Sequence, residues 1–149
     1  MDEPQPRYFE DIKVGDTIPP REHGPFTIVE SVRWLGFQEN WSRTHMDRQH
    51  VQETRGLKSF ICSGAYRESL IARMITDWVG PEGMLRKLNL RQSLPTLEGD
   101  MMRFSGTVVE VSPAAGDPWV TCELQGTNQD DRQIVTGRCT VEIRSRATS

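Results

Sequence analysis

The sequence predicts an α+β fold in which a curved antiparallel sheet wraps around one long central helix. Residues 60–81 carry a wide apolar stripe at steps of three and four residues, as an amphipathic helix does. Four segments of alternating apolar and polar residues follow, separated by short turns, as in an antiparallel sheet with one buried face. Because 149 residues are typical of one domain, we expect residues 1–149 to form a single domain, with residues 1–7 as a flexible N-terminus.

The chain before the central helix predicts two short strands and a short helix. Residues 15–18, "GDTI", and residues 24–30, "GPFTIVE", flank a proline-rich connection, and each could start or carry a strand. Residues 30–40 place Val32 and Leu35 on one face, which suits a short helix.

Two further helices are indicated by their ends. In residues 46–56, Asp47 is a good N-cap and Gly56 is a good terminator. The central helix should stop at Gly80 and Pro81, because proline cannot continue a helix. Its apolar stripe is the candidate core and consists of Tyr66, Leu70, Ile71, Met74, Ile75 and Trp78.

The second half of the chain predicts the strands of the sheet. Its alternating segments are residues 84–94, 101–111, 119–129 and 133–145. The stretches between them, "EGD", "SPAAGDP" and "DD", are rich in turn-forming residues. Strands joined in this way pair as antiparallel neighbours, and their apolar faces would cover the central helix.

Composition argues against several classes of function. The chain has 18 Lys and Arg against 21 Asp and Glu, and the basic residues are scattered, so it does not look like a nucleic-acid-binding protein. No apolar run approaches the roughly 20 residues of a membrane span, and the N-terminus lacks the apolar core of a signal peptide. Cys62, Cys122 and Cys139 are far apart without metal-binding spacing, which predicts buried free thiols, no metal site and a reducing cytoplasm.

The most polar short stretch is "ENWSRTHMD", which contains one of only three histidines. Asn40 lies five residues before His45, a carboxylate follows two after it, and Gly56 comes nine further on. The stretch "GLKSFICSG" then ends at Gly64. In spacing and order, this region resembles the hydratase motif of the MaoC-like acyl dehydratase and (R)-specific enoyl-CoA hydratase family.

Two other motifs carry the same resemblance. "YFEDIKVGDTIP" is similar to the opening of these enzymes, and "LPTLEGDMMRFSGTVVEV" to their later strand pair. Together the motifs cover roughly residues 8 to 145. The resemblance implies a hot-dog fold and an enzyme that hydrates or dehydrates acyl thioesters, a hydro-lyase.

The resemblance implies that His45 and Asn40 are catalytic. The unperturbed pKa of histidine side chains, about 6.5, allows His45 to give and take protons near neutral pH. The family most often has Asp where this chain has Asn40, and an amide cannot accept a proton as a base. Asn40 could still hold the reacting water, as in relatives similar to the mesaconyl-CoA hydratase group. It could also be a helix C-terminal residue in the left-handed conformation.

The resemblance also implies that Gly64, at the start of the central helix, is catalytic as the oxyanion donor, and that Ser63, Arg43 and Asp47 bind the substrate. The backbone N–H of Gly64 would face the thioester oxygen, and a glycine would let the substrate approach closely. Ser63 could add a hydroxyl donor. Arg43 and Asp47 could contact the ligand, but Arg43 could equally be solvated and Asp47 an N-cap.

The expected reaction is reversible addition of water to a 2-enoyl thioester, which needs a coenzyme A thioester as substrate and no cofactor. An acyl-CoA thioesterase is one alternative, for which Glu68 is the carboxylate nearest the start of the helix. Another is a non-catalytic or partner-dependent subunit. "RMITDWVGPEGMLRKLNLR" is similar to small hot-dog subunits of steroid side-chain degradation, which pair with a second hot-dog chain. We therefore expect a homodimer, or a heteromer of that kind.

Overall fold

The computed structural model describes residues 7–113 and 118–148, so most of the predicted flexible N-terminus lies outside it. Within these ranges, five strands form one antiparallel sheet in the order β1-β3-β4-β5-β2. The strands are β1 (Thr17–His23), β2 (Met84–Gln92), β3 (Met102–Ser112), β4 (Trp119–Asn128) and β5 (Gln133–Glu142). The helices are α1 (Ile28–Phe37), α2 (Arg48–Arg55) and α3 (Gly64–Val79), with short 3-10 turns η1 (Phe9–Asp11), η2 (Arg43–His45) and η3 (Arg146–Thr148).

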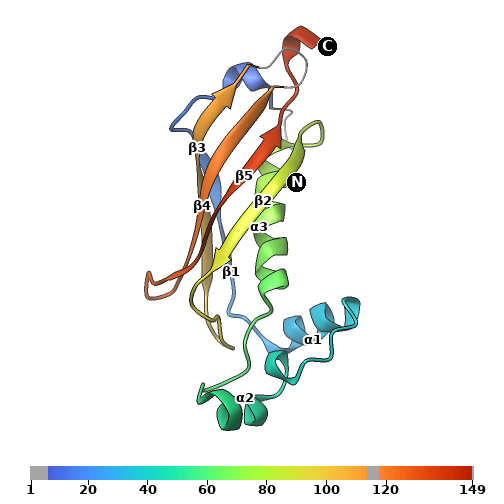
Figure 1. Cartoon of the computed structure of the whole chain (residues 1–149), viewed down its shortest axis with the longest axis vertical. Helices are drawn as coiled ribbons and strands as arrows, with labels where there is room; N and C mark the ends of the chain where they lie inside the picture. Colours follow the sequence, from blue (N-terminus) through green and yellow to red (C-terminus); the bar gives the residue numbers. More distant parts are fainter. Residues whose placement is uncertain (1–6, 114–117, 149) are drawn as a thin grey trace.

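The long helix α3 lies against one face of the sheet, and the smaller helices α1 and α2 lie together beyond the end at which α3 begins (Figure 1). The prediction of a curved sheet around one central helix is confirmed, and so are the four strands of the second half. None of the helices in the described residues has the length and apolar character needed to cross a membrane.

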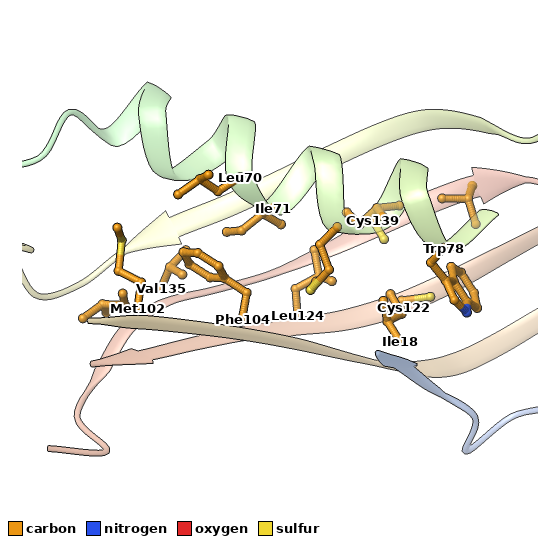
Figure 2. Packing of buried hydrophobic residues seen from close by; sticks show 14 of the residues in the cluster. Ile18, Leu70, Ile71, Trp78, Met102, Phe104, Cys122, Leu124, Val135 and Cys139 are labelled. Carbon is orange, nitrogen blue, oxygen red and sulfur yellow. The ribbon is translucent and has the colours of Figure 1, made fainter. Parts of the chain in front are cut away.

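The core lies between α3 and the sheet. Leu70, Ile71 and Trp78 point from the helix toward strand residues such as Phe104 and Leu124 (Figure 2). Each fully buried aliphatic or aromatic side chain of this kind contributes about 1.5–3 kcal/mol of hydrophobic stabilisation. The predicted stripe is confirmed as core at Leu70, Ile71, Met74, Ile75 and Trp78, which are all buried. Tyr66 is only partly buried, because its hydroxyl joins a polar cluster described below.

The predicted helix ends at both sides of α2 are confirmed. The Asp47 side chain accepts a hydrogen bond from the backbone N–H of His50, and Gly56 closes the helix in the left-handed conformation with φ 66°. Gly80 likewise ends α3.

Three expectations in the first half of the chain are wrong. The proline-rich connection is part of β1, which runs through Pro19 and Pro20 at the edge of the sheet, where missing N–H donors are tolerated. Residues 24–30 are not a strand, because Thr27 is the N-cap of α1 and the helix begins at Ile28. Val32 and Leu35 were placed on one apolar face of α1, but only Leu35 is buried, whereas the side chain of Val32 is 46% exposed.

The three cysteines are free and buried, as predicted. Cys122 and Cys139 are far apart in the sequence but adjacent in space, because they are directly opposed on the paired strands β4 and β5. Sequence spacing could not show this, since it depends on the register of two strands.

Candidate active site

The ring of His45 is fixed at the end of η2. Its Nδ1 lies 2.8 Å from the backbone carbonyl oxygen of Ile61. A carbonyl can only accept, so Nδ1 carries the proton, and in the neutral ring Nε2 keeps its lone pair. In the part of the chain that the structure describes, Nε2 has no hydrogen-bond partner. His45 is therefore oriented as a base with one free nitrogen, on a half-buried ring.

The backbone around His45 is held from two sides. The hydroxyl of Ser31, on α1, donates to the carbonyl oxygen of His45 at 2.6 Å. The N–H of Ile61 donates to the carbonyl oxygen of Thr44 at 3.0 Å. Because Ile61 lies three residues before Gly64, these contacts bring the histidine to the start of α3.

Asn40 is placed by the way α1 ends. Its N–H donates to the carbonyl of Leu35, and the N–H of Glu39 to that of Gly36, which is the Schellman arrangement. Glu39, with φ 52°, is the left-handed residue, so the alternative that placed Asn40 in that conformation is wrong. The Asn40 side-chain oxygen accepts from the N–H of Ser42 at 3.1 Å, forming an Asx turn. This turn leads the chain from α1 to η2 and His45.

Gly64 is the first residue of α3, and the preceding Ser63 makes no side-chain capping bond. The first N–H groups of a helix have no intrahelical acceptor, and the helix dipole makes this end positive. The first turn of α3 can therefore receive a developing oxyanion. Ser63 is buried, and among the described residues its hydroxyl has no partner.

The predicted reason for a glycine at position 64 needs correction. A Cβ there would lie 3.6 Å from Nε2 of Gln92 on β2, which is ordinary van der Waals contact. The absent side chain is thus directed at the sheet and not into open space. Close approach of a substrate does not explain this glycine, and what Gly64 can offer the thioester is its N–H.

Arg43 and Asp47 bind each other. Nε and Nη2 of Arg43 lie 2.9 and 2.7 Å from Oδ2 of Asp47, whose Oδ1 accepts from the N–H of His50. The His50 hydrogen bond and the Arg43 guanidinium hold the pKa of Asp47 below its ordinary value. Asp47 is therefore the N-cap of α2, the alternative raised from the sequence. Contact of Arg43 or Asp47 with a ligand stays a prediction.

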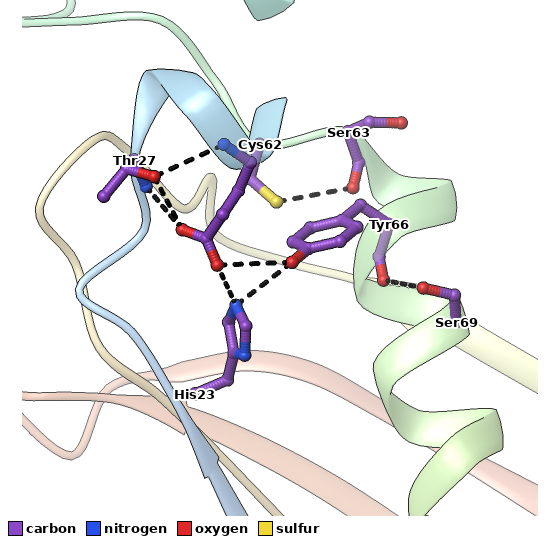
Figure 3. Close-up of polar contacts among 7 residues, drawn as sticks. His23, Thr27, Cys62, Ser63, Tyr66 and Ser69 are labelled. Atoms are coloured by element: carbon purple, nitrogen blue, oxygen red, sulfur yellow. Dashed lines mark hydrogen bonds and ion pairs between the residues drawn. The ribbon is translucent and has the colours of Figure 1, made fainter. Parts of the chain in front are cut away.

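The sequence analysis missed a polar cluster beside the start of α3. His23 of β1, Glu30 of α1 and Tyr66 of α3 meet there, next to Cys62 and Thr27 (Figure 3). The signal for part of it was present, because "TIVE" is a capping-box sequence in which the fourth residue returns to the cap.

Three other features of the described residues lie away from the predicted site or do not form one: a surface cavity, the carboxylate of Glu68 and possible metal ligands. A surface cavity of about 730 Å³ lies on the face of the sheet opposite α3 and is lined by residues of β2 to β5. Glu68, the carboxylate that a thioesterase reaction would need, is exposed on α3. Among the described residues, no three His, Cys, Asp or Glu side chains are grouped as metal ligands.

Comparison with known proteins identifies the family. No family model matches the sequence. A curated protein of Mycobacterium tuberculosis, the 3-oxo-4,17-pregnadiene-20-carboxyl-CoA hydratase beta subunit, is 30% identical over 103 residues, which are 69% of this chain and 73% of that protein. The chain belongs to the MaoC-like acyl dehydratase and (R)-specific enoyl-CoA hydratase family.

Solved structures agree with the hot-dog fold of this family. The ChsH1-ChsH2 complex of Mycobacterium tuberculosis contains a chain that is 24% identical, with a TM-score of 0.76 over 89% of this chain and 98% of that one. The R-hydratase PhaJ1 of Pseudomonas aeruginosa is 20% identical, with a TM-score of 0.82 over 93% and 86%. As a member of the MaoC-like family, the chain is a hydratase or dehydratase, that is, a hydro-lyase.

Proposed function

We propose that this chain adds water reversibly to a 2-enoyl thioester between η2 and the first turn of α3, with Nε2 of His45 as acid and base. The observation that carries the proposal is the bond from Nδ1 of His45 to Ile61, which leaves Nε2 unprotonated in the neutral ring. In hydration, Nε2 takes a proton from water as the oxygen attacks the β-carbon, and a proton is delivered to the α-carbon.

In this proposal, Asn40 holds the reacting water and Gly64 stabilises the oxyanion, which a histidine alone cannot do. The Asn40 oxygen is used in its Asx turn, so the side-chain NH₂ group is the part available to hold the reacting water. The N–H of Gly64 stabilises the negative charge that builds on the thioester oxygen. Proton transfer and hydrogen bonding suffice for this reaction, so the proposal includes no cofactor beyond the coenzyme A of the substrate.

The substrate class follows from the family and not from a cavity. The relative named above acts on a steroid-derived acyl-CoA, and PhaJ1 is an (R)-hydratase. The proposed substrates are therefore acyl-CoA thioesters of either kind, bulky and steroid-like or linear and fatty. We also propose a cytoplasmic location, because buried free thiols are typical of a reducing compartment.

The open edge of the sheet suggests where a second chain binds. β1 and β2 are the two edge strands. Pro19 and Pro20 remove two N–H donors from β1, whereas β2 contains no proline over nine residues. An unprotected edge strand pairs readily with another strand. We propose a homodimer through β2, with a heteromer containing a second hot-dog chain as the alternative that the ChsH1-ChsH2 complex suggests.

Assays with the wild type and His45→Asn test the function. Asn can keep the hydrogen bond to Ile61 but has no base at the Nε2 position, so turnover should fall by about 10² to 10⁴-fold without loss of the fold. The panel contains crotonyl-CoA and longer or bulkier 2-enoyl-CoA thioesters, followed by loss of the conjugated absorbance. A parallel thiol-release assay detects thioesterase activity.

The outcomes separate the candidate functions. Hydration that depends on His45 supports the proposal. Free thiol without hydration supports a thioesterase. His45→Asn retaining more than half of wild-type turnover excludes His45 as the catalyst. Hydration only after addition of a second hot-dog chain supports a partner-dependent subunit.

A further inference from the structure

Helix α1 connects the polar cluster to His45. Glu30 and Ser31 are consecutive residues of its first turns. The hydroxyl of Ser31 holds the carbonyl oxygen of His45 at 2.6 Å. Any movement of α1 along or about its axis therefore moves the anchor of the histidine, and what fixes Glu30 also fixes Ser31.

The positioning cluster, defined as His23, Glu30 and Tyr66, ties three elements together. Oε1 of Glu30 lies 2.7 Å from Nε2 of His23, and the two side chains are 28% and 23% exposed. The hydroxyl of Tyr66 lies 3.1 Å from the same nitrogen and donates to Oε1 of Glu30 at 3.4 Å. β1, α1 and α3 thus meet at Oε1 of Glu30, and Figure 3 shows His23 and Tyr66 pointing toward each other beside it.

The other oxygen of Glu30 serves the helix itself. Oε2 accepts from the N–H and the hydroxyl of Thr27, both at 2.9 Å, and completes the capping box. Burial alone would raise the pKa of Glu30, but the Thr27 hydrogen bonds and the charge of His23 outweigh it and lower that pKa. Burial and the Glu30 charge raise the pKa of Tyr66 to about 12, so its hydroxyl stays a donor.

Aromatic packing adds a second set of contacts between α1 and α3. The Tyr66 ring lies 5.4 Å from Trp34 of α1 and 5.8 Å from Phe26, measured between ring centroids. Two turns of α1 are thereby held against the first turn of α3, one by hydrogen bonds and one by ring contact. Partly buried hydrogen bonds of a carboxylate are directional and resist sliding more than apolar contacts do.

We propose that the positioning cluster His23, Glu30 and Tyr66 sets the position of His45 through Ser31. The inference rests on the proposed function, in which His45 is the acid and base. None of the three residues needs to touch the substrate. They act by keeping Nε2 of His45 in place relative to the first turn of α3, and misplacement of a catalytic group lowers kcat more than it changes substrate binding.

Two conservative variants and a matched control test the inference. Glu30→Gln keeps the capping box, which accepts Gln at this position, but removes the charge paired with His23. Tyr66→Phe removes the hydroxyl and keeps the ring contacts. Asp77→Asn breaks the Arg21–Asp77 ion pair of 2.9 Å, which also joins β1 to α3 but near the far end of the helix.

We expect Glu30→Gln and Tyr66→Phe each to lower kcat about tenfold with KM within about twofold, and Asp77→Asn to leave both within about twofold. Ser31→Ala should lower kcat similarly, and Ser31→Ala combined with Glu30→Gln should lose less than the product of the single losses. A kcat of Glu30→Gln equal to that of wild type or of Asp77→Asn overturns the inference.

A second measurement does not depend on activity. The chain has three histidines, so the ring proton signals of His23, His45 and His50 can be assigned by single substitutions in NMR spectra. The His45 signal should shift or broaden in Glu30→Gln and remain unchanged in Asp77→Asn. An unchanged His45 signal in Glu30→Gln overturns the inference. Wild type without hydration refutes the proposed function instead, and the His45 signal then decides the positioning role alone.

Discussion

Replacing Gly64 by proline, with alanine as the matched control, tests the oxyanion donor directly. Gly64 is the first residue of α3, and proline is favoured at this position because its fixed φ suits a helix and its missing N–H has no intrahelical acceptor. Ser63 has ψ 135°, which a residue before proline readily adopts. Gly64→Pro therefore removes one N–H while preserving the helix, and Gly64→Ala keeps that N–H.

The contacts at position 64 set the expected magnitudes. The new Cβ of either variant would meet the side chain of Gln92 at 3.6 to 3.9 Å, an ordinary contact, so neither variant should be destabilised by crowding. Gly64→Ala should gain up to about 1 kcal/mol from helix propensity. Loss of one oxyanion donor costs about 10² to 10³ in kcat in comparable sites. We expect that loss in Gly64→Pro and less than about tenfold in Gly64→Ala.

The assay follows hydration of the best 2-enoyl-CoA substrate under saturating conditions. Circular dichroism and thermal unfolding of both variants serve as controls for the fold. If Gly64→Pro unfolds like the wild type and turns over substrate as fast as Gly64→Ala, the thioester oxygen is held elsewhere, and the role assigned to Gly64 is wrong.

Three further expectations concern other parts of the chain. Asn40→Asp should retain or raise hydration, because one carboxylate oxygen keeps the Asx turn and the other can accept a hydrogen bond from the reacting water in place of the contact to the NH₂ group. Asn40→Ala should be much slower, and equal rates of the two variants in the kinetic assay would mean that Asn40 does not hold water. The lowered pKa of Glu30 adds stability above its ordinary value of 4.5, and this is lost as pH falls through the folded value, so urea midpoints should drop more steeply for wild type than for Glu30→Gln below about pH 4.5. Light scattering should give at least twice the chain mass of 17.0 kDa, and a monomer at micromolar concentration would refute pairing through β2.

The sequence predicted the parts of the fold that depend on local pattern. The stripe of α3 and the four alternating strands were found because burial on one face imposes a period on the residues. Pro19 and Pro20 were misplaced because a strand tolerates proline only at a sheet edge, and which strand is the edge depends on topology. Residues 24–30 resemble a strand in local pattern, and only the capping signal of Thr27 and Glu30 marks them as the start of a helix.

The sequence points to candidate residues of the site but not to their contacts. His45, Asn40 and Gly64 are predicted through a motif and stay predictions, whereas the contact from His45 to Ile61 spans 16 residues and depends on how the chain folds back. The polar cluster draws on β1, α1 and α3, with His23 and Tyr66 separated by 43 residues, so no short pattern could reveal it. The sequence suggests that a glycine at position 64 makes room for the substrate. Only the structure shows that a side chain there would face Gln92 instead.

The two edges of the sheet differ, and this limits how copies of the chain can aggregate. A strand with two prolines is a poor template for another strand, whereas β2 is a good one. If each chain offers one receptive edge, pairing two such edges closes the assembly, and a third chain has nowhere to add. Polymerisation into fibrils needs a receptive edge on both sides of every sheet. With the proposed pairing through β2, the prolines of β1 would confine strand pairing to pairs of chains and oppose open-ended growth.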